Sequence, residues 1–141
     1  MTGSAVFACV ACLSMFGCGG GSSSDNDGGG GRGANGGTGT SSGLSRAATV
    51  KSLTPAQAGT LCDWQSGKQG GYGRSVDCAD GSTQTTDPDK TMCVSAVSAV
   101  GSLCPTLTVG DVEDCANASQ TDLCSFETQA GCANVRACIG P

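Results

Sequence analysis

The sequence predicts an all-α fold: a small disulfide-stapled domain of three to four short helices, preceded by a signal segment and a disordered Gly/Ser-rich linker. Three observations lead to this prediction. Of the 11 cysteines, eight lie between Cys62 and Cys138, and 13 of the 24 glycines lie between Gly17 and Gly43. Several helix-start signals occur after Gly43. The chain therefore divides into residues 1–17, 18–43 and 44–141.

Composition excludes several classes of function. The 141 residues carry a formal net charge of −5. This charge disfavours a nucleic-acid partner, because a protein that binds nucleic acid needs a basic surface. The chain has no histidine, so it lacks the usual general base near neutral pH and the imidazole ligand of many zinc sites. We therefore expect no enzymatic activity, no catalytic residue, no metal site and no cofactor.

Residues 1–17 are predicted to be a signal peptide. Residues 5–16 (AVFACVACLSMF) are apolar or small and uncharged. This run is shorter than the ~20 helical residues that cross a bilayer. It suits the apolar region of a secretory signal. A soluble secreted protein and a buried N-terminal helix are the two alternatives.

The end of this run, Met15-Phe16-Gly17-Cys18, resembles the lipobox of bacterial lipoproteins. The resemblance implies cleavage before Cys18 and attachment of acyl chains to that residue. Two or three acyl chains hold a protein stably on a membrane, at about 0.8 kcal/mol per buried methylene. The lipoprotein sorting rule, applied to Gly19, implies an outer-membrane lipoprotein of the cell envelope.

The rest of the segment 18–43 is predicted to be a tether. It contains no aliphatic side chain larger than alanine. Such a sequence cannot bury enough apolar surface to offset the ordering cost of ~1–2 kcal/mol per residue. We expect these residues to hold the following domain away from the membrane.

Residues 44–141 contain an even number of cysteines, which predicts four disulfides in an exported protein. Their order along the chain allows 105 pairings, and the sequence does not choose among them. No C-x-x-C occurs among the eight, which disfavours zinc ligation and redox catalysis. The eight are Cys62, Cys78, Cys93, Cys104, Cys115, Cys124, Cys132 and Cys138.

Capping signals predict where the first three helices begin. Thr54 followed by Pro55 predicts a helix that stops at Gly67, and Asp87-Pro88 predicts a second helix that Pro105 closes. Thr108 with Asp111 forms a capping box for the third. A short final helix is expected over residues 128–138.

In the second predicted helix, four residues recur at helical spacing and should form one buried stripe: Cys93, Val97, Val100 and Cys104. The two cysteines of this stripe would lie ~16 Å apart along the axis. We therefore expect them to bond to different elements.

The turn-rich residues 67–87 are predicted to form a loop with one short strand at 74–78. Trp64 and Tyr72 have two interpretations. They either pack on the domain or form an exposed recognition patch, since both residue types anchor interfaces. The acidic residues between Asp77 and Asp89 are interpreted as turn and cap residues rather than a catalytic pair.

Three short patterns, Cys62-Asp63-Trp64, Gly70–Gly73 and Cys104-Pro105, resemble small cysteine-rich lipoproteins of myxobacteria. These relatives carry no assigned activity, so the resemblance implies location and shape only. The leading hypothesis is a lipid-anchored envelope protein that presents a rigid binding or structural module to an envelope partner. The alternative is a small envelope enzyme, or an enzyme inhibitor that acts through the loop 67–87.

Overall fold

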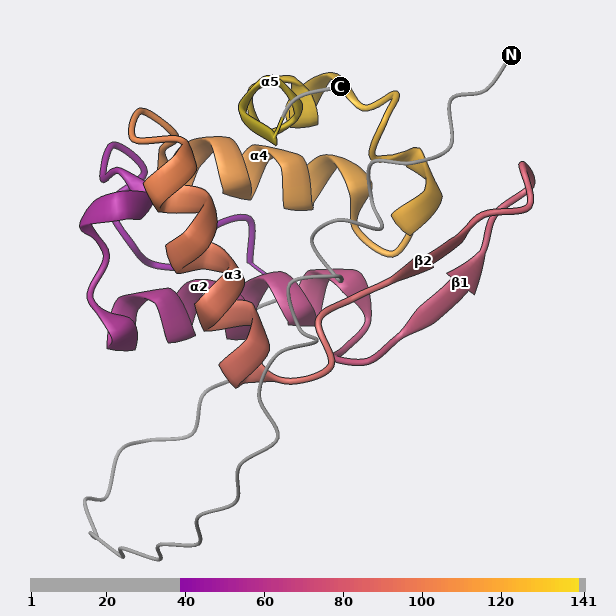
Figure 1. The fold of residues 1–141 in the computed structure, drawn as a ribbon, viewed down its shortest axis with the longest axis horizontal. Coiled ribbons are helices and arrows are strands. Elements are labelled where there is room, and N and C mark those ends of the chain that lie inside the picture. The colour runs from indigo at the N-terminus through magenta and orange to yellow at the C-terminus, as the bar shows by residue number, and fades with distance from the viewer. Residues whose placement is uncertain (1–38, 140–141) are drawn as a thin grey trace, which may run out of the picture. The chain divides into compact units, whose positions relative to one another are not determined.

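Helices make up more than half of the described residues, 39–139, in a computed structural model of the chain (Figure 1). The predicted helical, disulfide-stapled fold is confirmed, with the addition of one small β-hairpin. The elements in chain order are η1 (Val50–Ser52), α2 (Pro55–Gln69), β1 (Ser75–Asp77), β2 (Thr83–Thr85), α3 (Lys90–Leu103), α4 (Val109–Ser119), η2 (Leu123–Ser125), η3 (Ala130–Cys132) and α5 (Ala133–Ile139).

Helix α2 begins where the sequence predicts but ends later. The Thr54 side chain accepts a hydrogen bond from the Gln57 backbone N–H, and the Gln57 side chain accepts one from the Thr54 N–H. The predicted stop at Gly67 is wrong. A glycine inside a helix costs only about 1 kcal/mol. The helix ends instead at Gly70, whose φ of 87° suits the left-handed cap that glycine favours.

Helices α3 and α4 are also capped by local side chains. Asp89, rather than the predicted Asp87, caps α3 by accepting a hydrogen bond from the Met92 N–H. The Thr108–Asp111 capping box of α4 is confirmed, with both reciprocal hydrogen bonds formed.

The last helix, α5, begins at Ala133 rather than near residue 128. The short helix η3 precedes it and lies directly against α4. A Cβ added to Gly131 would lie 2.7 Å from the Asp114 carbonyl oxygen, so this contact admits only glycine. The close approach of η3 to α4 delays the start of α5.

The hydrophobic core lies between the helices. Helix α2 packs against α3 and α4, and one cluster of buried side chains lies between α2 and α4: Leu61, Trp64, Val109 and Ala116. A second cluster (Val50, Cys104, Leu107) lies where η1 and α3 meet α5. Val112 contacts both clusters and so joins them into a continuous core.

All eight cysteines of the domain form disulfides. The pairs are Cys62–Cys93, Cys78–Cys124, Cys104–Cys138 and Cys115–Cys132. The predicted stripe on α3 is confirmed, because Cys93 and Cys104 are buried and its two valines, Val97 and Val100, are partly buried. As expected, these two cysteines bond to different elements, α2 and α5.

The loop 67–87 contains two strands instead of the one predicted. Strands β1 and β2 pair antiparallel, with Val76 opposite Gln84. The hairpin extends away from the helices in Figure 1 and contacts the short helix η2. We call residues 74–86 together with η2 the hairpin arm. We call the remaining elements the helical body, which comprises η1, α2, α3, α4, η3 and α5.

Candidate functional site

The N-terminal part of the described chain is fastened to the helical body through a buried carboxylate. Glu113 on α4 is fully buried and accepts hydrogen bonds from the Ser42 backbone N–H (2.6 Å) and hydroxyl (2.7 Å). The Ser41 hydroxyl (3.2 Å) and Arg46 Nη1 (2.9 Å) also donate to this carboxylate. We call residues 39–46 the strap.

The strap sets the protonation of Glu113. Burial alone would raise the pKa of this carboxyl, but the hydrogen bonds from Ser42, Ser41 and Arg46 outweigh burial and hold its pKa below the ordinary value. Arg46 also binds the exposed Asp114 at 2.7 Å. Glu113 is therefore a structural anion that holds the strap on α4.

The strap corrects the predicted boundary of the tether. The sequence places residues 39–43 in the tether, but the Gly39 and Thr40 carbonyls accept hydrogen bonds from Trp64 Nε1 (2.9 Å) and Asn117 Nδ2 (2.7 Å). The folded domain thus begins at least five residues earlier than residue 44. The preceding tether residues lie outside the described range.

Trp64 does not form an exposed recognition patch with Tyr72. Its side chain is 4% exposed and belongs to the core cluster between α2 and α4. Lys68, one helical turn along α2, places its ammonium group 5.6 Å from the centre of the indole ring. The packing interpretation is correct for Trp64, and only Tyr72 lies near the surface.

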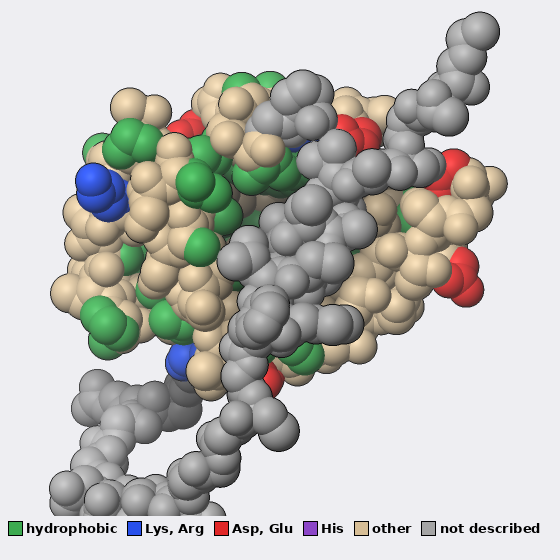
Figure 2. All heavy atoms as spheres, in the orientation of Figure 1, with side chains coloured by type: hydrophobic (Ala, Val, Ile, Leu, Met, Phe, Trp, Pro, Cys, Tyr) green, Lys and Arg blue, Asp and Glu red, His purple; other side chains and the backbone are tan. Residues whose placement is uncertain are grey.

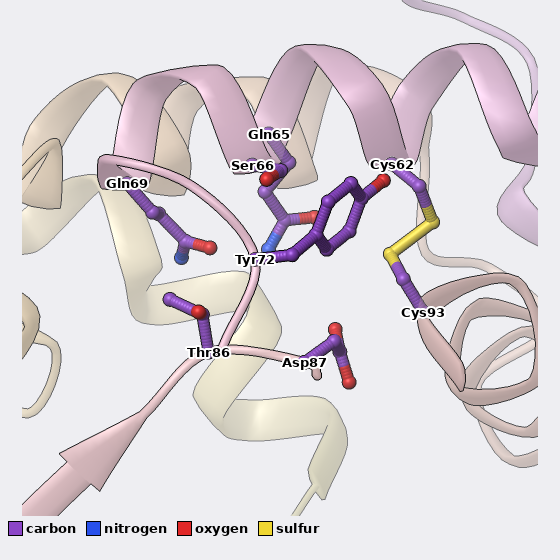
Figure 3. Close-up of a pocket in the computed structure, with 8 residues that line it drawn as sticks. All are labelled: Cys62, Gln65, Ser66, Gln69, Tyr72, Thr86, Asp87 and Cys93. Carbon is purple, nitrogen blue, oxygen red and sulfur yellow. A yellow bond between two sulfur atoms is a disulfide. The ribbon is translucent and has the colours of Figure 1, made fainter. Parts of the chain in front are cut away.

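Tyr72 lines a shallow hollow between α2 and the base of the hairpin (Figure 3). The Tyr72 hydroxyl donates a hydrogen bond to Asp63 Oδ1 at 3.1 Å, and Lys90 Nζ binds Asp63 Oδ2 at 2.7 Å. Burial, followed by the contact with Asp63, raises the pKa of Tyr72 to about 12. Burial and the nearby Asp89 raise the pKa of Asp87.

The hollow is small for a ligand site. It encloses about 170 Å³ including its open mouth, whereas most small-molecule sites enclose roughly 300–1,000 Å³. The Tyr72 ring and the Cys62–Cys93 disulfide line it together with polar side chains, and Thr86 closes its base by donating a hydrogen bond to the Gly71 carbonyl (2.9 Å). The residues around the hollow therefore hold the base of the hairpin arm in place rather than form a ligand site.

The hairpin arm is held at both ends. At its base, Arg74 Nη1 donates to the carbonyl oxygens of Gln69 (2.7 Å) and Thr121 (2.8 Å), and the Gly73 N–H donates to the Asp87 carbonyl (2.8 Å). At its tip, the Cys78–Cys124 disulfide joins the end of β1 to η2. The arm is therefore a rigid projection.

The strands of the arm expose backbone groups along both edges. Arg74 pairs with Thr86, and Cys78 pairs with Ser82, through backbone hydrogen bonds. Hydrogen-bonded and non-hydrogen-bonded pairs alternate along an antiparallel ladder, so the residues one step inward from these two pairs point their backbone N–H and C=O groups outward. An extended segment of another protein can pair with such an edge. The four outward-facing residues are Ser75, Asp77, Thr83 and Thr85.

The acidic residues of the loop 67–87 form separate local contacts. Asp77 accepts a hydrogen bond from the Thr83 hydroxyl (2.9 Å), and Asp80 accepts bonds from the Ser82 N–H and hydroxyl. The Ser82 contacts lower the pKa of Asp80. Among residues 39–139, no group of three or more acidic, cysteine or histidine side chains is placed to hold a metal ion.

Comparison with protein-family models, curated proteins and solved structures returned no match to this chain. Within the described residues, no helix is both long enough and apolar enough to cross a membrane. The predicted lipidation site, Cys18, lies outside the described residues. The signal, the lipid anchor and the likeness to myxobacterial lipoproteins therefore stay predictions.

Sequence reasoning missed the strap and the role of Glu113. The acidic residues at the start of α4 look like ordinary first-turn carboxylates, which the helix dipole favours, and Ser41 and Ser42 resemble the Gly/Ser tether before them. One available signal was the spacing of Glu113 from Val109 and Ala116, four and three residues away, which places a carboxylate on the buried face of α4.

Proposed function

We propose that the protein is a lipid-anchored envelope protein that presents its helical body and hairpin arm as a non-enzymatic recognition module. The observation that carries this proposal is the hairpin arm. Its strands are polar except for Val76 and are partly or fully exposed, and its side chains belong to neither cluster of the hydrophobic core. The arm is nevertheless fixed at both ends, which is typical of an element whose shape matters to a partner.

The partner class follows from the edges and charges of the arm. Outward-facing backbone groups favour an extended protein segment that adds a strand. The arm carries Asp77 and Asp80, and Asp122 directly precedes its η2 segment, while the one cation of the arm, Arg74, is bound to carbonyl oxygens. Acidic side chains also gather at the right-hand end of the surface in Figure 2. A basic, extended segment of an envelope protein fits these features.

Site-specific cross-linking tests the recognition role. A photoreactive residue at the exposed position Thr85 should capture a defined partner in native envelopes, through a segment rich in lysine or arginine. The matched control is the same residue at Ser98, on the exposed face of α3. Equal capture at both positions, or none at Thr85, would contradict recognition through the arm.

The anchor has a separate test. The intact mass of protein extracted from native membranes should correspond to a chain that begins at Cys18 with added acyl groups and with eight thiol protons lost from the domain. A Cys18→Ala variant should leave the membrane fraction. An unmodified N-terminus in the native protein would contradict the anchor while leaving the role of the arm open to the cross-linking test.

One further observation favours an enzyme inhibitor as a second candidate function. The tip of the arm is an exposed turn between Cys78 and Ser82, where Asp80 accepts hydrogen bonds from Ser82 and the disulfide anchors the strand. Rigid exposed loops of this kind suit an enzyme cleft. The oxidised protein, but not a variant with the tip residues 79–81 replaced, should then inhibit an envelope peptidase.

A further inference from the structure

The four disulfides differ in how far they are buried. In three of the disulfides at least one of the two cysteines is buried, and in two of these three both cysteines are buried. The exception is Cys78–Cys124, in which Cys78 is partly exposed and Cys124 is exposed. The buried residues of the other bridges are Cys62, Cys93, Cys104, Cys115 and Cys132.

We propose that the Cys78–Cys124 bridge is a thiol–disulfide exchange site that reversibly releases the hairpin arm. Exchange requires a thiolate to approach one sulfur of a disulfide, so access decides which bridge reacts. Cys124 lies on the short helix η2 and is the more exposed of the two residues. The incoming thiolate therefore attacks Cys124, and Cys78 leaves as a thiolate.

The reductant is a dithiol, either a small molecule or a dithiol oxidoreductase. Its first thiolate forms a mixed disulfide with the Cys124 sulfur, and the bond between Cys124 and Cys78 breaks. Its second thiolate then attacks the first sulfur of the reductant, and Cys124 leaves as a thiolate. The reductant becomes a disulfide through the loss of two electrons and two protons, and both cysteines become thiols after protonation.

Reduction at this site leaves the helical body cross-linked. The remaining bridges join α2 to α3, α5 to the end of α3, and α4 to η3. The hairpin strands contact η2 and keep the hydrogen bonds at their base, such as Thr86 N–H to the Arg74 carbonyl. Opening of the bridge therefore frees the tip of the arm while the base remains a hinge.

Charge around the bridge selects the thiol. Asp77 precedes Cys78, and Asp122 lies two residues before Cys124. These carboxylates repel an anionic thiol reagent and attract a cationic one. At low salt we expect each carboxylate to change the ratio of the rates for cationic and anionic thiols by about threefold, because the interaction acts across solvent. The site therefore favours neutral or cationic reductants.

Partial reduction of the full chain tests the site. Free thiols are first blocked with iodoacetamide, dithiothreitol is then added in increasing amounts, and new thiols are labelled with N-ethylmaleimide and located by peptide mapping. Cys78 and Cys124 should be labelled before the other six, while the far-UV helical signal is retained and hydrogen exchange increases at 75–85. Earlier labelling of any other pair, or simultaneous labelling of all eight, would overturn the proposal.

Reagent charge tests the selectivity. Cysteamine and glutathione are monothiols and so report on the first exchange step. Cysteamine should form the mixed disulfide at Cys124 faster than glutathione, and an Asp77→Asn, Asp122→Asn variant should narrow this difference in rate about tenfold at low salt. At high salt, each reagent should open the bridge at similar rates in the native protein and in the Asp77→Asn, Asp122→Asn variant. A rate difference that is unchanged by the substitutions would overturn the selective role of the two carboxylates.

Discussion

The helical body and the hairpin arm are both cross-linked, but only the body is stabilised by a hydrophobic core. Buried apolar side chains surround the bridges of the body, as at Cys62, which is fully buried beside Leu61. The arm has a short polar ladder, a few hydrogen bonds at its base and one exposed bridge. The eight cysteines of the domain therefore serve two different purposes in the fold.

Removal of a bridge from each region gives the largest expected effects. The Cys115→Ala, Cys132→Ala variant should lower the free energy of unfolding by about 3 kcal/mol, because a loop of this length is no longer closed in the unfolded chain. If loop length alone decided the loss of stability, removal of Cys78–Cys124 would cost more than removal of Cys115–Cys132, since the first bridge spans 46 residues and the second 17.

We expect the opposite order for unfolding of the helices. In a Cys78→Ser, Cys124→Ser variant the arm gains freedom in the native state as well, so the midpoint of helix unfolding should fall less than in the Cys115, Cys132 variant. Urea unfolding followed by circular dichroism measures both. A larger loss in the Cys78, Cys124 variant would contradict the independence of the body and the arm.

Truncation of Glu113 should be nearly as damaging. Glu113→Ala leaves the Ser42 N–H and the Arg46 guanidinium without their acceptor, and should cost about 3 kcal/mol. Asp114→Ala is the matched control, because Asp114 binds the same arginine from an exposed position and should cost less than about 1 kcal/mol. Equal losses in the two variants would contradict the buried anchor of the strap.

The pH dependence of stability should differ between the two regions. Because the folded pKa of Glu113 is lowered, its contribution is present above the ordinary value of 4.5 and is lost as the pH falls through the folded pKa. Asp87 has a raised folded pKa, so its contribution near the base of the arm increases as the pH falls toward 3.8.

Thermal unfolding between pH 6 and pH 3 measures this dependence. Glu113→Gln should flatten the loss of stability on acidification, and Asp87→Asn should steepen it. Profiles for both variants that run parallel to that of the native protein would contradict these assignments.

Glycine substitutions separate packing from backbone strain. Gly131→Ala places a Cβ 2.7 Å from the Asp114 carbonyl oxygen and should cost about 2 kcal/mol in the body. Gly81→Ala meets open space but must adopt a φ of 84°, which should cost about 1 kcal/mol. Hydrogen exchange should show the second effect in the arm only. Increased exchange in α4 of the Gly81 variant would contradict this separation.

A favourable change of similar or smaller size is expected at the junction of the two regions. Gln120, which follows α4, has φ 42° and ψ −122°, a backbone conformation that residues other than glycine seldom adopt. Gln120→Gly should therefore raise the free energy of unfolding by up to about 1 kcal/mol. A loss of stability in this variant would show that the side chain has a stabilising contact.

The features that the sequence predicted correctly depend on neighbouring residues. Thr54 and Thr108 cap helices through side chains three residues away, so their sequence patterns are sufficient. The even number of cysteines likewise indicated four disulfides. The pairing was not predictable, because it depends on which helices pack together, and neither the caps nor the spacing contains that information.

The features that escaped prediction depend on distant contacts. The hydrogen bond between the Ser42 N–H and Glu113 spans 71 residues, and the one between Trp64 and Gly39 spans 25. Ser42 lies in a sequence that resembles a flexible linker, and only the opposite partner gives it a fixed position. The second strand of the arm, with the sequence TQT, has no apolar alternation by which it could be recognised.

Disulfide mapping of the native, unreduced protein tests the division into a body and an arm most directly. Digestion without reduction should give four linked peptide pairs: Cys62 with Cys93, Cys78 with Cys124, Cys104 with Cys138, and Cys115 with Cys132. A peptide that links Cys78 or Cys124 to any cysteine of the body would contradict the account, because the arm would then be part of the cross-linked core.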